Sequence, residues 1–259
     1  MRCSFDRVIH LALALLVLLA APAHAQDALR ERLSVPWGVG ERLEYDVKFG
    51  KLKVGAGSME VVDVQDVRGR ETWHPIFEVR GGTFFYRVND TFESWFDTRT
   101  GNSLRFRQEL KGGRRDVERL YNMFPERAQF IENSDTSMAS VAAPLDECTF
   151  LYFIRTIPLV VGETYSFNRY FKPDRNPVTI KVLRRERIRV PAGEFDAIVL
   201  QPVIKAGGIF GEDDHAEVWL SDDDNRIMLQ MKSGLSFGSL NLYLTSYRPA
   251  RAGATTKAP

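Results

Sequence analysis

Few residues of this sequence have the types and spacing that catalysis requires. The run Gly234-Leu-Ser236-Phe-Gly238 has the Gly-x-Ser-x-Gly spacing in which a histidine activates a serine nucleophile. That chemistry needs a turn from a strand into a helix and a histidine later in the chain, but no histidine follows His215. We therefore interpret this run as a glycine-flanked hairpin turn between two strands.

Two acidic runs, Asp213–His215 and Asp222–Asp224, contain residue types that bind metals. A zinc site needs three or four converging nitrogen, sulfur or oxygen ligands, and beyond the first 25 residues the chain has only His74 and His215. The second run lacks the glycine and the distal glutamate of a calcium loop. We predict solvated turns here, with no metal site and no cofactor.

Cys148 and four glutamates are the remaining candidates for chemistry. Cys148 lies in an apolar segment with no nearby base, which favours a buried small side chain over a nucleophile. Hydrolases use pairs of carboxylates. Two such pairs are conceivable here: Glu41 with Glu163, and Glu93 with Glu217. The same positions suit strand starts and solvent-facing partners. We expect a protein that is not an enzyme, and a hydrolase using a carboxylate pair stays open as an alternative.

The first 25 residues have the three parts of a secretory signal peptide. Arg2 and Arg7 provide positive charge, an apolar run covers residues 11–20, and Ala23-His24-Ala25 is a small-x-small cleavage site. The apolar run is shorter than the ~20 residues that span a bilayer. We predict cleavage after Ala25 and a periplasmic mature protein without a transmembrane segment. An uncleaved N-terminal anchor is the alternative.

The composition excludes several classes of function. Removing Arg2, Arg7 and Asp6 with the signal peptide leaves 33 basic and 33 acidic residues, and no block of five or six basic residues occurs. Nucleic-acid binding needs clustered Lys and Arg to neutralise phosphates, so we do not expect it. Cys148 is the one cysteine that remains, which excludes an intrachain disulfide in the mature chain.

Hydrophobic periodicity predicts a protein made mainly of strands. In the segment 42–49, apolar Leu43, Tyr45, Val47 and Phe49 alternate with charged residues, as in a half-buried antiparallel strand. Similar runs, separated by turn residues about every 8–12 positions, continue to residue 248. One helix is predicted at residues 147–156, capped by Asp146 and followed by Pro158.

Short motifs recur in the two halves of the chain. Val39-Gly-Glu41 matches Val161-Gly-Glu163 at an offset of 122, and Glu93-Ser-Trp95 resembles Glu217-Val-Trp219 at an offset of 124. We predict a mainly β fold with two related curved antiparallel sheets, as a sandwich or a pair of half-barrels, joined by one buried helix. The expected segments are a signal peptide (1–25), a polar lead (26–37), a first β half (38–143), a connecting helix (144–158), a second β half (159–248) and a flexible tail (249–259).

Large aromatic residues occur on both faces of the predicted strands. One face must meet the core, and the other is covered, lines a cavity or contacts a partner. A core covered on both faces and a groove for an apolar ligand both account for this pattern. The candidates for lining a ligand site are Tyr45, Phe49, Tyr86, Trp95, Trp219 and Tyr243.

Four segments resemble bacterial exported proteins of domain-of-unknown-function family 3108. They are residues 39–55, the helical segment 145–156, the turn 191–197 and the strand and turn 218–223. Together the likeness covers roughly residues 38–248, although Cys148 stands where a small residue such as Ser or Ala is expected. The resemblance implies a β-rich envelope protein and brings no activity, cofactor or catalytic residue. Trp95–Gly101 is also similar, more loosely, to a strand and turn of lipoprotein-carrier half-barrels.

We therefore expect a non-catalytic periplasmic protein that binds an apolar or amphipathic envelope ligand, such as a lipid or a lipoprotein acyl chain, in a concave sheet. The alternative is a structural or assembly module that contacts envelope proteins or peptidoglycan. The first predicts an apolar cavity between the sheets. The second predicts an exposed aromatic patch and an envelope protein that can be cross-linked to it.

Overall fold

The computed structural model describes residues 33–83, 86–112, 116–133, 135–204, 216–235 and 238–251. At 83, 86–88, 233–235 and 238–240 the description covers the backbone alone. The residues predicted as a signal peptide, most of the polar lead and the tail from 252 onward lie outside the described residues. The chain from Ser34 onward forms one compact unit, and all the described elements belong to it.

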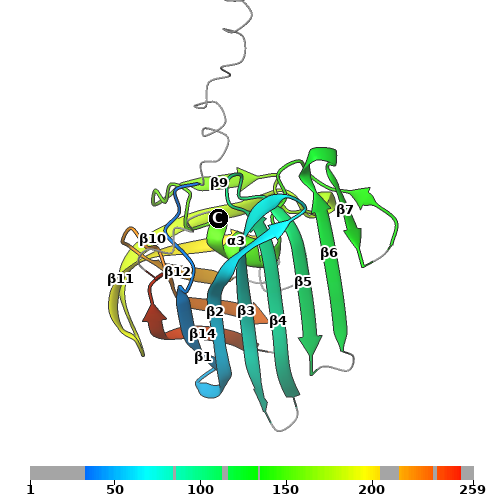
Figure 1. Ribbon diagram of the computed structural model, residues 1–259. Helices are drawn as coiled ribbons and strands as arrows, with labels where there is room; N and C mark the ends of the chain where they lie inside the picture. The colour runs from blue at the N-terminus through cyan, green and yellow to red at the C-terminus, as the bar shows by residue number, and fades with distance from the viewer. Residues whose placement is uncertain are drawn as a thin grey trace, which may run out of the picture. The chain divides into compact units, whose positions relative to one another are not determined.

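Within the described residues, fourteen strands form one antiparallel sheet (Figure 1). The sheet order is β8-β7-β6-β5-β4-β3-β2-β1-β14-β13-β12-β11-β10-β9. The strands of the first half are β1 (Arg42–Phe49), β2 (Leu52–Val67), β3 (Arg70–Thr83), β4 (Tyr86–Asp97), β5 (Ser103–Lys111), β6 (Val117–Phe124), β7 (Gln129–Glu132) and β8 (Met138–Ala139). Those of the second half are β9 (Thr164–Phe167), β10 (Val178–Val190), β11 (Gly193–Val203), β12 (Glu217–Ser221), β13 (Met228–Leu235) and β14 (Gly238–Arg248). Two short 3-10 helices occupy Pro125–Arg127 and Pro173–Arg175.

The mainly β fold and the connecting helix are confirmed, and the two halves share one sheet. The link is the pairing of β1 with β14, in which Arg42 lies opposite Arg248 and Phe49 lies opposite Leu240. A pattern of alternating residues shows that a strand exists but does not identify its neighbour. Short motifs therefore predicted two related halves, while the pairing of the first strand with the last was not visible in them.

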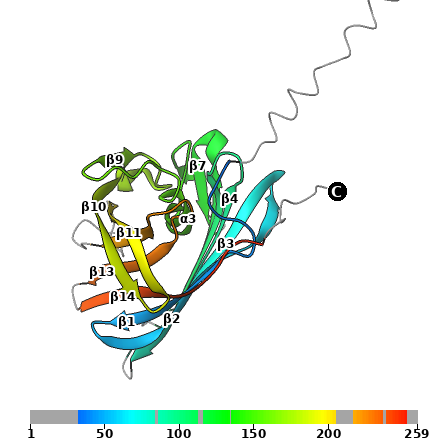
Figure 2. The same cartoon turned by 90° about the vertical axis from the view of Figure 1, so that its left-hand side faces the viewer.

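The helix α3 (Glu147–Phe153) lies on the concave side of the curved sheet (Figure 2). Asp146 caps it, because its side chain accepts a hydrogen bond from the backbone N–H of Thr149. The helix ends three residues earlier than predicted, and Ile154 forms its C-terminal cap. All of its residues from Cys148 to Tyr152 are buried, which agrees with the prediction of a helix that is apolar on most sides.

The hydrophobic core fills the space between α3 and the concave face. Tyr45, Met59 and Phe106 contribute to it from the first half, and Val218 and Leu244 from the second half. Each of these side chains is at most 2% exposed. Because one cluster contains residues of both halves and of the helix, the two halves share a single core.

The two halves repeat the same backbone details. Gly40 N–H donates to the Val61 carbonyl and Val61 N–H donates to the Glu41 carbonyl. The second half repeats both bonds: Gly162 N–H donates to the Val182 carbonyl, and Val182 N–H donates to the Glu163 carbonyl. The φ angles of Gly40 and Gly162 are 84° and 90°, a region that favours glycine. The matching motifs in the sequence therefore mark equivalent turns.

The register shifts of the sheet also recur at equivalent places. One shift follows Val61 in the β2–β3 pair and another follows Val182 in the β10–β11 pair. A second type of shift follows Trp95 in the β4–β5 pair and Trp219 in the β12–β13 pair. Bulges bend a sheet and increase its local twist, so each half curves at corresponding positions.

Candidate functional site

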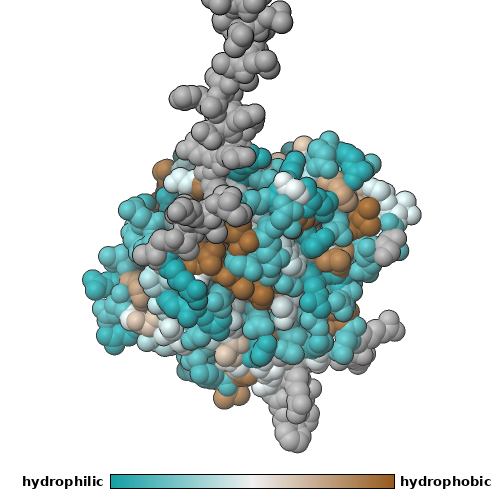
Figure 3. Space-filling view, in the orientation of Figure 1, coloured by the Kyte–Doolittle hydropathy of each residue, from teal (hydrophilic) through white to brown (hydrophobic). Residues whose placement is uncertain are grey.

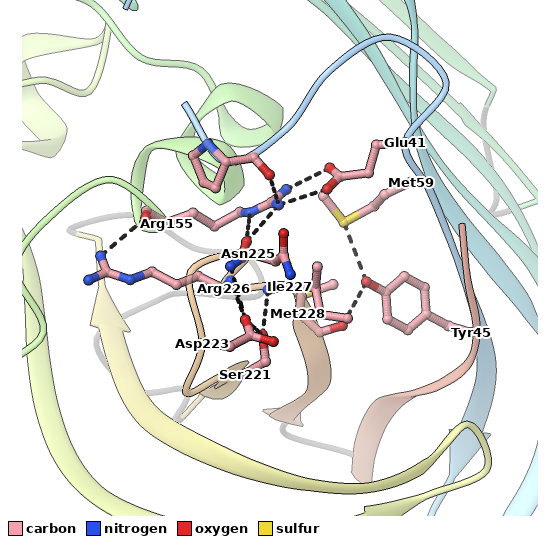
Figure 4. Close-up of polar contacts among 11 residues, drawn as sticks. Glu41, Tyr45, Met59, Arg155, Ser221, Asp223, Asn225, Arg226, Ile227 and Met228 are labelled. Carbon is pink, nitrogen blue, oxygen red and sulfur yellow. Dashed lines mark hydrogen bonds and ion pairs between the residues drawn. The ribbon is translucent and has the colours of Figure 1, made fainter. Parts of the chain in front are cut away.

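A buried ion pair joins the start of the first half to the end of the helix (Figure 4). Arg155 lies just after α3 and donates from two nitrogen atoms to the two carboxylate oxygens of Glu41, each at 2.8 Å. The two side chains are only 2% and 1% exposed. Two parallel hydrogen bonds are the strong geometry for Arg and a carboxylate, and burial leaves no room for water screening.

Arg155 also binds backbone carbonyl groups from distant parts of the chain. Its guanidinium donates to the Asn225 carbonyl at 2.8 Å and to the Pro36 carbonyl at 3.2 Å. Arg226 in turn donates to the carbonyls of Arg155, at 3.2 Å, and Ile157, at 2.5 Å. The ion pair therefore connects the N-terminal segment, the end of α3 and the turn between β12 and β13.

The electrostatics of this ion pair favour the charged forms. Burial by itself lowers the pKa of Arg155, but the hydrogen bonds and the negative charge of Glu41 outweigh it and raise the pKa. Burial also raises the pKa of nearby Tyr45, whose hydroxyl donates to the Met228 carbonyl at 3.0 Å. Both oxygens of Glu41 are occupied by Arg155, so the arrangement holds elements together rather than offering a free base.

A second buried polar group attaches α3 to the sheet. The Asp146 carboxylate accepts hydrogen bonds from the Ser94 hydroxyl at 2.6 Å and from the Thr149 hydroxyl at 3.0 Å. Asp146 N–H donates to the Ser103 hydroxyl at 3.0 Å. All four residues are at most 2% exposed. Burial raises the pKa of Asp146 to about 6, although the hydrogen bonds from Ser94 and Thr149 oppose that shift.

His74 lies between two carboxylates on the face of the sheet opposite α3. Its Nδ1 is 2.8 Å from Asp63 Oδ1, and its Nε2 is 2.7 Å from Glu93 Oε1. The imidazole stacks on Trp95, with ring centroids 4.6 Å apart. Burial by itself lowers the pKa of His74, but the hydrogen bonds and charges of Glu93 and Asp63 outweigh it and raise the pKa.

The two tryptophans of the repeat make equivalent hydrogen bonds. Trp95 Nε1 donates to Gln65 Oε1 at 2.8 Å, and Trp219 Nε1 donates to Glu186 Oε1 at 2.6 Å. Each bond spans from one strand to the second strand along, β4 to β2 and β12 to β10. Since the same contact occurs in both halves, we interpret it as a structural contact of the repeated strands.

The tip of the β1–β2 hairpin exposes apolar and basic side chains together. Phe49 and Leu52 are 37% and 64% exposed. Lys48, Lys51 and Lys53 surround them in the sequence. In Figure 3, a small group of brown atoms lies at the lower left edge of the view, where Figure 1 places this hairpin. We call residues 48–53 the basic tip.

The six predicted ligand-lining residues lie in different environments. Tyr45 and Trp219 are buried at 1% and 2% exposure, and Trp95 stacks on His74. Tyr243 packs against the core edge beneath Lys48, whose Nζ lies 4.8 Å from its ring centroid. Phe49 belongs to the basic tip. The side chain of Tyr86 lies outside the described part of the chain.

The remaining candidates for chemistry have structural surroundings. Cys148 is buried at 1% exposure, and burial raises the pKa of its thiol, as the sequence predicted for an unreactive side chain. The Gly-x-Ser-x-Gly run begins in β13 and ends in β14, which pair as antiparallel neighbours with Leu235 opposite Gly238. The run therefore lies between two strands and not between a strand and a helix. Asp223 accepts the backbone N–H groups of Asn225 and Arg226 within its turn. The run Asp213–His215 lies outside the described residues.

No group of three or more His, Cys, Asp or Glu side chains in the described ranges is arranged to hold a metal ion. Asp63 and Glu93 bind opposite nitrogen atoms of His74, so their oxygens do not converge on one point. One carboxylate of each suggested pair has a cationic partner: Arg155 for Glu41 and Arg184 for Glu217. A search of the described helices finds none with the length and apolar character that crossing a membrane requires.

The fold and these sites define a mainly β protein in which one open antiparallel sheet curves around a buried helix. The family model described as protein of unknown function (DUF3108) matches residues 44–245. The chain belongs to this family. No curated protein matches the chain.

Three solved structures are similar to this chain at low sequence identity. A β-barrel-like protein of the DUF1849 family from Brucella abortus is similar with a TM-score of 0.56 and 12% identity, over 84% of this chain and 100% of that chain. A protein from Parabacteroides distasonis titled "putative lipoprotein" has a TM-score of 0.37 and 12% identity, over 84% and 100% of the two chains. A hypothetical protein from Chlamydia trachomatis has a TM-score of 0.31 and 8% identity, over 87% and 98%. At such identities the likeness to the Brucella protein extends to the fold alone.

Sequence reasoning did not find the partners of the buried polar groups. Glu41 and Arg155 are 114 residues apart, and Ser94 and Asp146 are 52 residues apart. The one available signal was an arginine directly after a predicted apolar helix, since a buried arginine needs an acidic partner. Nothing in the spacing identified Glu41 as that partner.

Proposed function

We propose that the protein is a non-catalytic, exported protein of the bacterial envelope that binds an apolar or amphipathic ligand, such as a lipid or a lipoprotein acyl chain. The observation that carries this proposal is the exposure of Phe49 and Leu52 at the basic tip. Large apolar side chains that stand in water together favour contact with an apolar partner. The predicted signal peptide supports an envelope location, which we place in the periplasm.

The ligand contact in this proposal lies at the rim of the sheet. The concave face, where the sequence suggested a ligand groove, carries α3 and a core that includes Tyr45 and Trp219. Binding at the rim requires no rearrangement of that core. Phe49 is the one member of the predicted lining set that is both described and strongly exposed.

Native mass spectrometry of the protein purified from the envelope tests this function. We expect the protein to retain lipid or a lipidated peptide, released by organic solvent and identified by its mass. A protein that carries no lipid, in envelope extracts where a known lipid carrier retains its own, would contradict the proposal. A cross-linked protein partner in that case would favour the assembly module.

A further inference from the structure

The basic tip combines two kinds of side chain that a hairpin turn does not need. Its sequence is Lys48-Phe-Gly-Lys51-Leu-Lys53, with no acidic residue among the six. The nearest acidic residue along β1 is Asp46, which pairs with Lys53 at 2.5 Å. The hairpin from 46 to 53 therefore has three lysines against one aspartate and is positively charged.

The backbone presents the two apolar side chains side by side. Phe49 and Leu52 are directly opposite each other in the β1–β2 pair, so they share one face of the hairpin. Gly50 between them has a φ angle of 58° and has no neighbouring atom within 4 Å of the place where a side chain would begin. The turn therefore projects from the sheet with open space around it.

The charges lie directly behind this apolar pair. Lys48 and Lys53 are opposite each other in the same β1–β2 pair, and Lys51 lies in the turn itself. Lysine side chains are long enough to reach outward while their stems cover apolar surface. Successive side chains of a strand face opposite sides, so Lys48 and Lys53 lie on the other face of the hairpin from Phe49 and Leu52. An apolar pair with lysines beside it complements the surface of an anionic bilayer, where phosphates lie just outside the acyl chains.

We propose that the basic tip docks the protein onto a bilayer that contains anionic phospholipid. Phe49 and Leu52 enter the boundary between head groups and acyl chains, and Lys48, Lys51 and Lys53 contact the phosphates. This inference rests on the proposed function, because it identifies the lipid class and the side chains that meet it. It also fixes the orientation: the end of the sheet that carries this hairpin faces the membrane.

Vesicle co-sedimentation tests the docking surface. It uses the exported protein as it is purified from cells, after any cleavage of the predicted signal peptide. The vesicles contain equal parts of phosphatidylglycerol and phosphatidylcholine, or phosphatidylcholine alone. We expect binding to the mixed vesicles that weakens as NaCl is added, because salt screens exposed charges. The triple variant Lys48→Gln, Lys51→Gln, Lys53→Gln should bind about a hundredfold more weakly, at about fivefold per lysine. The variant Phe49→Ser, Leu52→Ser should lose at least about tenfold.

Matched variants elsewhere on the sheet serve as controls. The first control is the double variant Val160→Ser, Val161→Ser, which changes two side chains that are 54% and 42% exposed. They lie just before β9, which is at the end of the view in Figure 1 opposite to the basic tip. The second control is a triple variant that removes three exposed charges from β10: Lys181→Gln, Arg187→Gln and Arg189→Gln. Both should bind the mixed vesicles within about twofold of the unmodified protein, since neither touches the tip. Thermal melts of all variants check that each one is folded.

The outcomes separate this inference from the proposed function. If the folded tip variants bind mixed vesicles as tightly as the controls, the basic tip is not the docking surface. If the unmodified protein binds neither kind of vesicle, or binds phosphatidylcholine equally well, docking on anionic phospholipid is wrong. In each of these cases a lipid retained in native mass spectrometry would leave the proposed function standing.

Discussion

At the scale of single residues, Arg155 is where three distant segments of the chain meet. Its guanidinium contacts Glu41, Pro36 and Asn225, which lie before the first strand and in the turn after β12. Removing two charges from water is costly, and the cost is offset here by two direct bonds and additional carbonyl acceptors. A single substitution leaves the other charge buried without a partner.

We expect Arg155→Leu to lower the free energy of unfolding by about 3–5 kcal/mol, measured by urea denaturation. The double variant Glu41→Leu, Arg155→Leu should recover part of this loss, because no unpaired charge remains. Arg189→Gln, which breaks an exposed pair with Glu194, is the control and should change stability by at most about 1 kcal/mol. Equal effects of Arg155→Leu and the control would show that the pair does not hold these segments.

His74 should make stability depend on pH near neutrality. Its folded pKa is raised above the ordinary value of 6.5. The stabilisation is therefore fully present below about pH 6.5 and is lost as the pH rises through the folded pKa. We expect the free energy of unfolding to fall across that window, and His74→Gln to remove this fall. An NMR titration of the imidazole that gives a pKa below 6.5 would contradict the expectation.

At the scale of elements, α3 depends on Asp146 both for its first turn and for its position on the sheet. The carboxylate caps the helix through Thr149 and accepts a hydrogen bond from Ser94 on β4. Seven residues are too few for a helix to be stable in isolation, so docking must supply its stability. The buried charge of Asp146 opposes that docking, which is why its pKa is raised.

A folded pKa of about 6 against an ordinary 3.8 means that the folded protein holds this proton more tightly. Stability should fall as the pH rises from about 4 to about 6, by about 3 kcal/mol at about 1.4 kcal/mol per pKa unit. The pH range of this fall lies below the pH range in which His74 changes stability. We expect Asp146→Asn to remove the fall, since an amide still caps the helix, and Asp146→Ala to destabilise at every pH. Urea denaturation at closely spaced pH values measures both, and an unchanged slope in Asp146→Asn would contradict the assignment.

At the scale of the whole unit, the repeat built two similar halves that do not separate. Equivalent turns follow Gly40 and Gly162, and equivalent tryptophan bonds join β4 to β2 and β12 to β10. The pairing of β1 with β14 and the shared core then join the halves. Each half alone would expose a long strand edge and one side of that core.

We therefore expect neither 26–143 nor 144–259 to fold when it is expressed alone. Circular dichroism during urea titration should show one cooperative transition for the whole chain and none for either half. Co-expression of the two halves, which restores the β1–β14 edge and the shared core, is the control and should recover a folded complex. A cooperative transition in an isolated half would show that the halves are independent domains.

Local patterns in the sequence carried much of the fold. Alternation at Leu43 to Phe49 identified a strand, and Asp146 with Pro158 identified the helix, because pleat and capping depend on near neighbours. The matched Val-Gly-Glu motifs located equivalent turns for the same reason. The helix end was placed three residues too late, since nothing local distinguishes its last turn from the turn that follows.

By itself, the sequence determined a mainly β fold with a buried helix, the equivalent turns of its two halves and the burial of Cys148. Only the tertiary structure decided which distant side chains share a buried site, such as Glu41 with Arg155, and which predicted aromatic side chains are buried. It also showed that Phe49 is exposed while Tyr45, in the same alternating strand β1, is in the core. The physical reason is that periodicity states which face a side chain occupies, whereas burial depends on what other elements bring to that face.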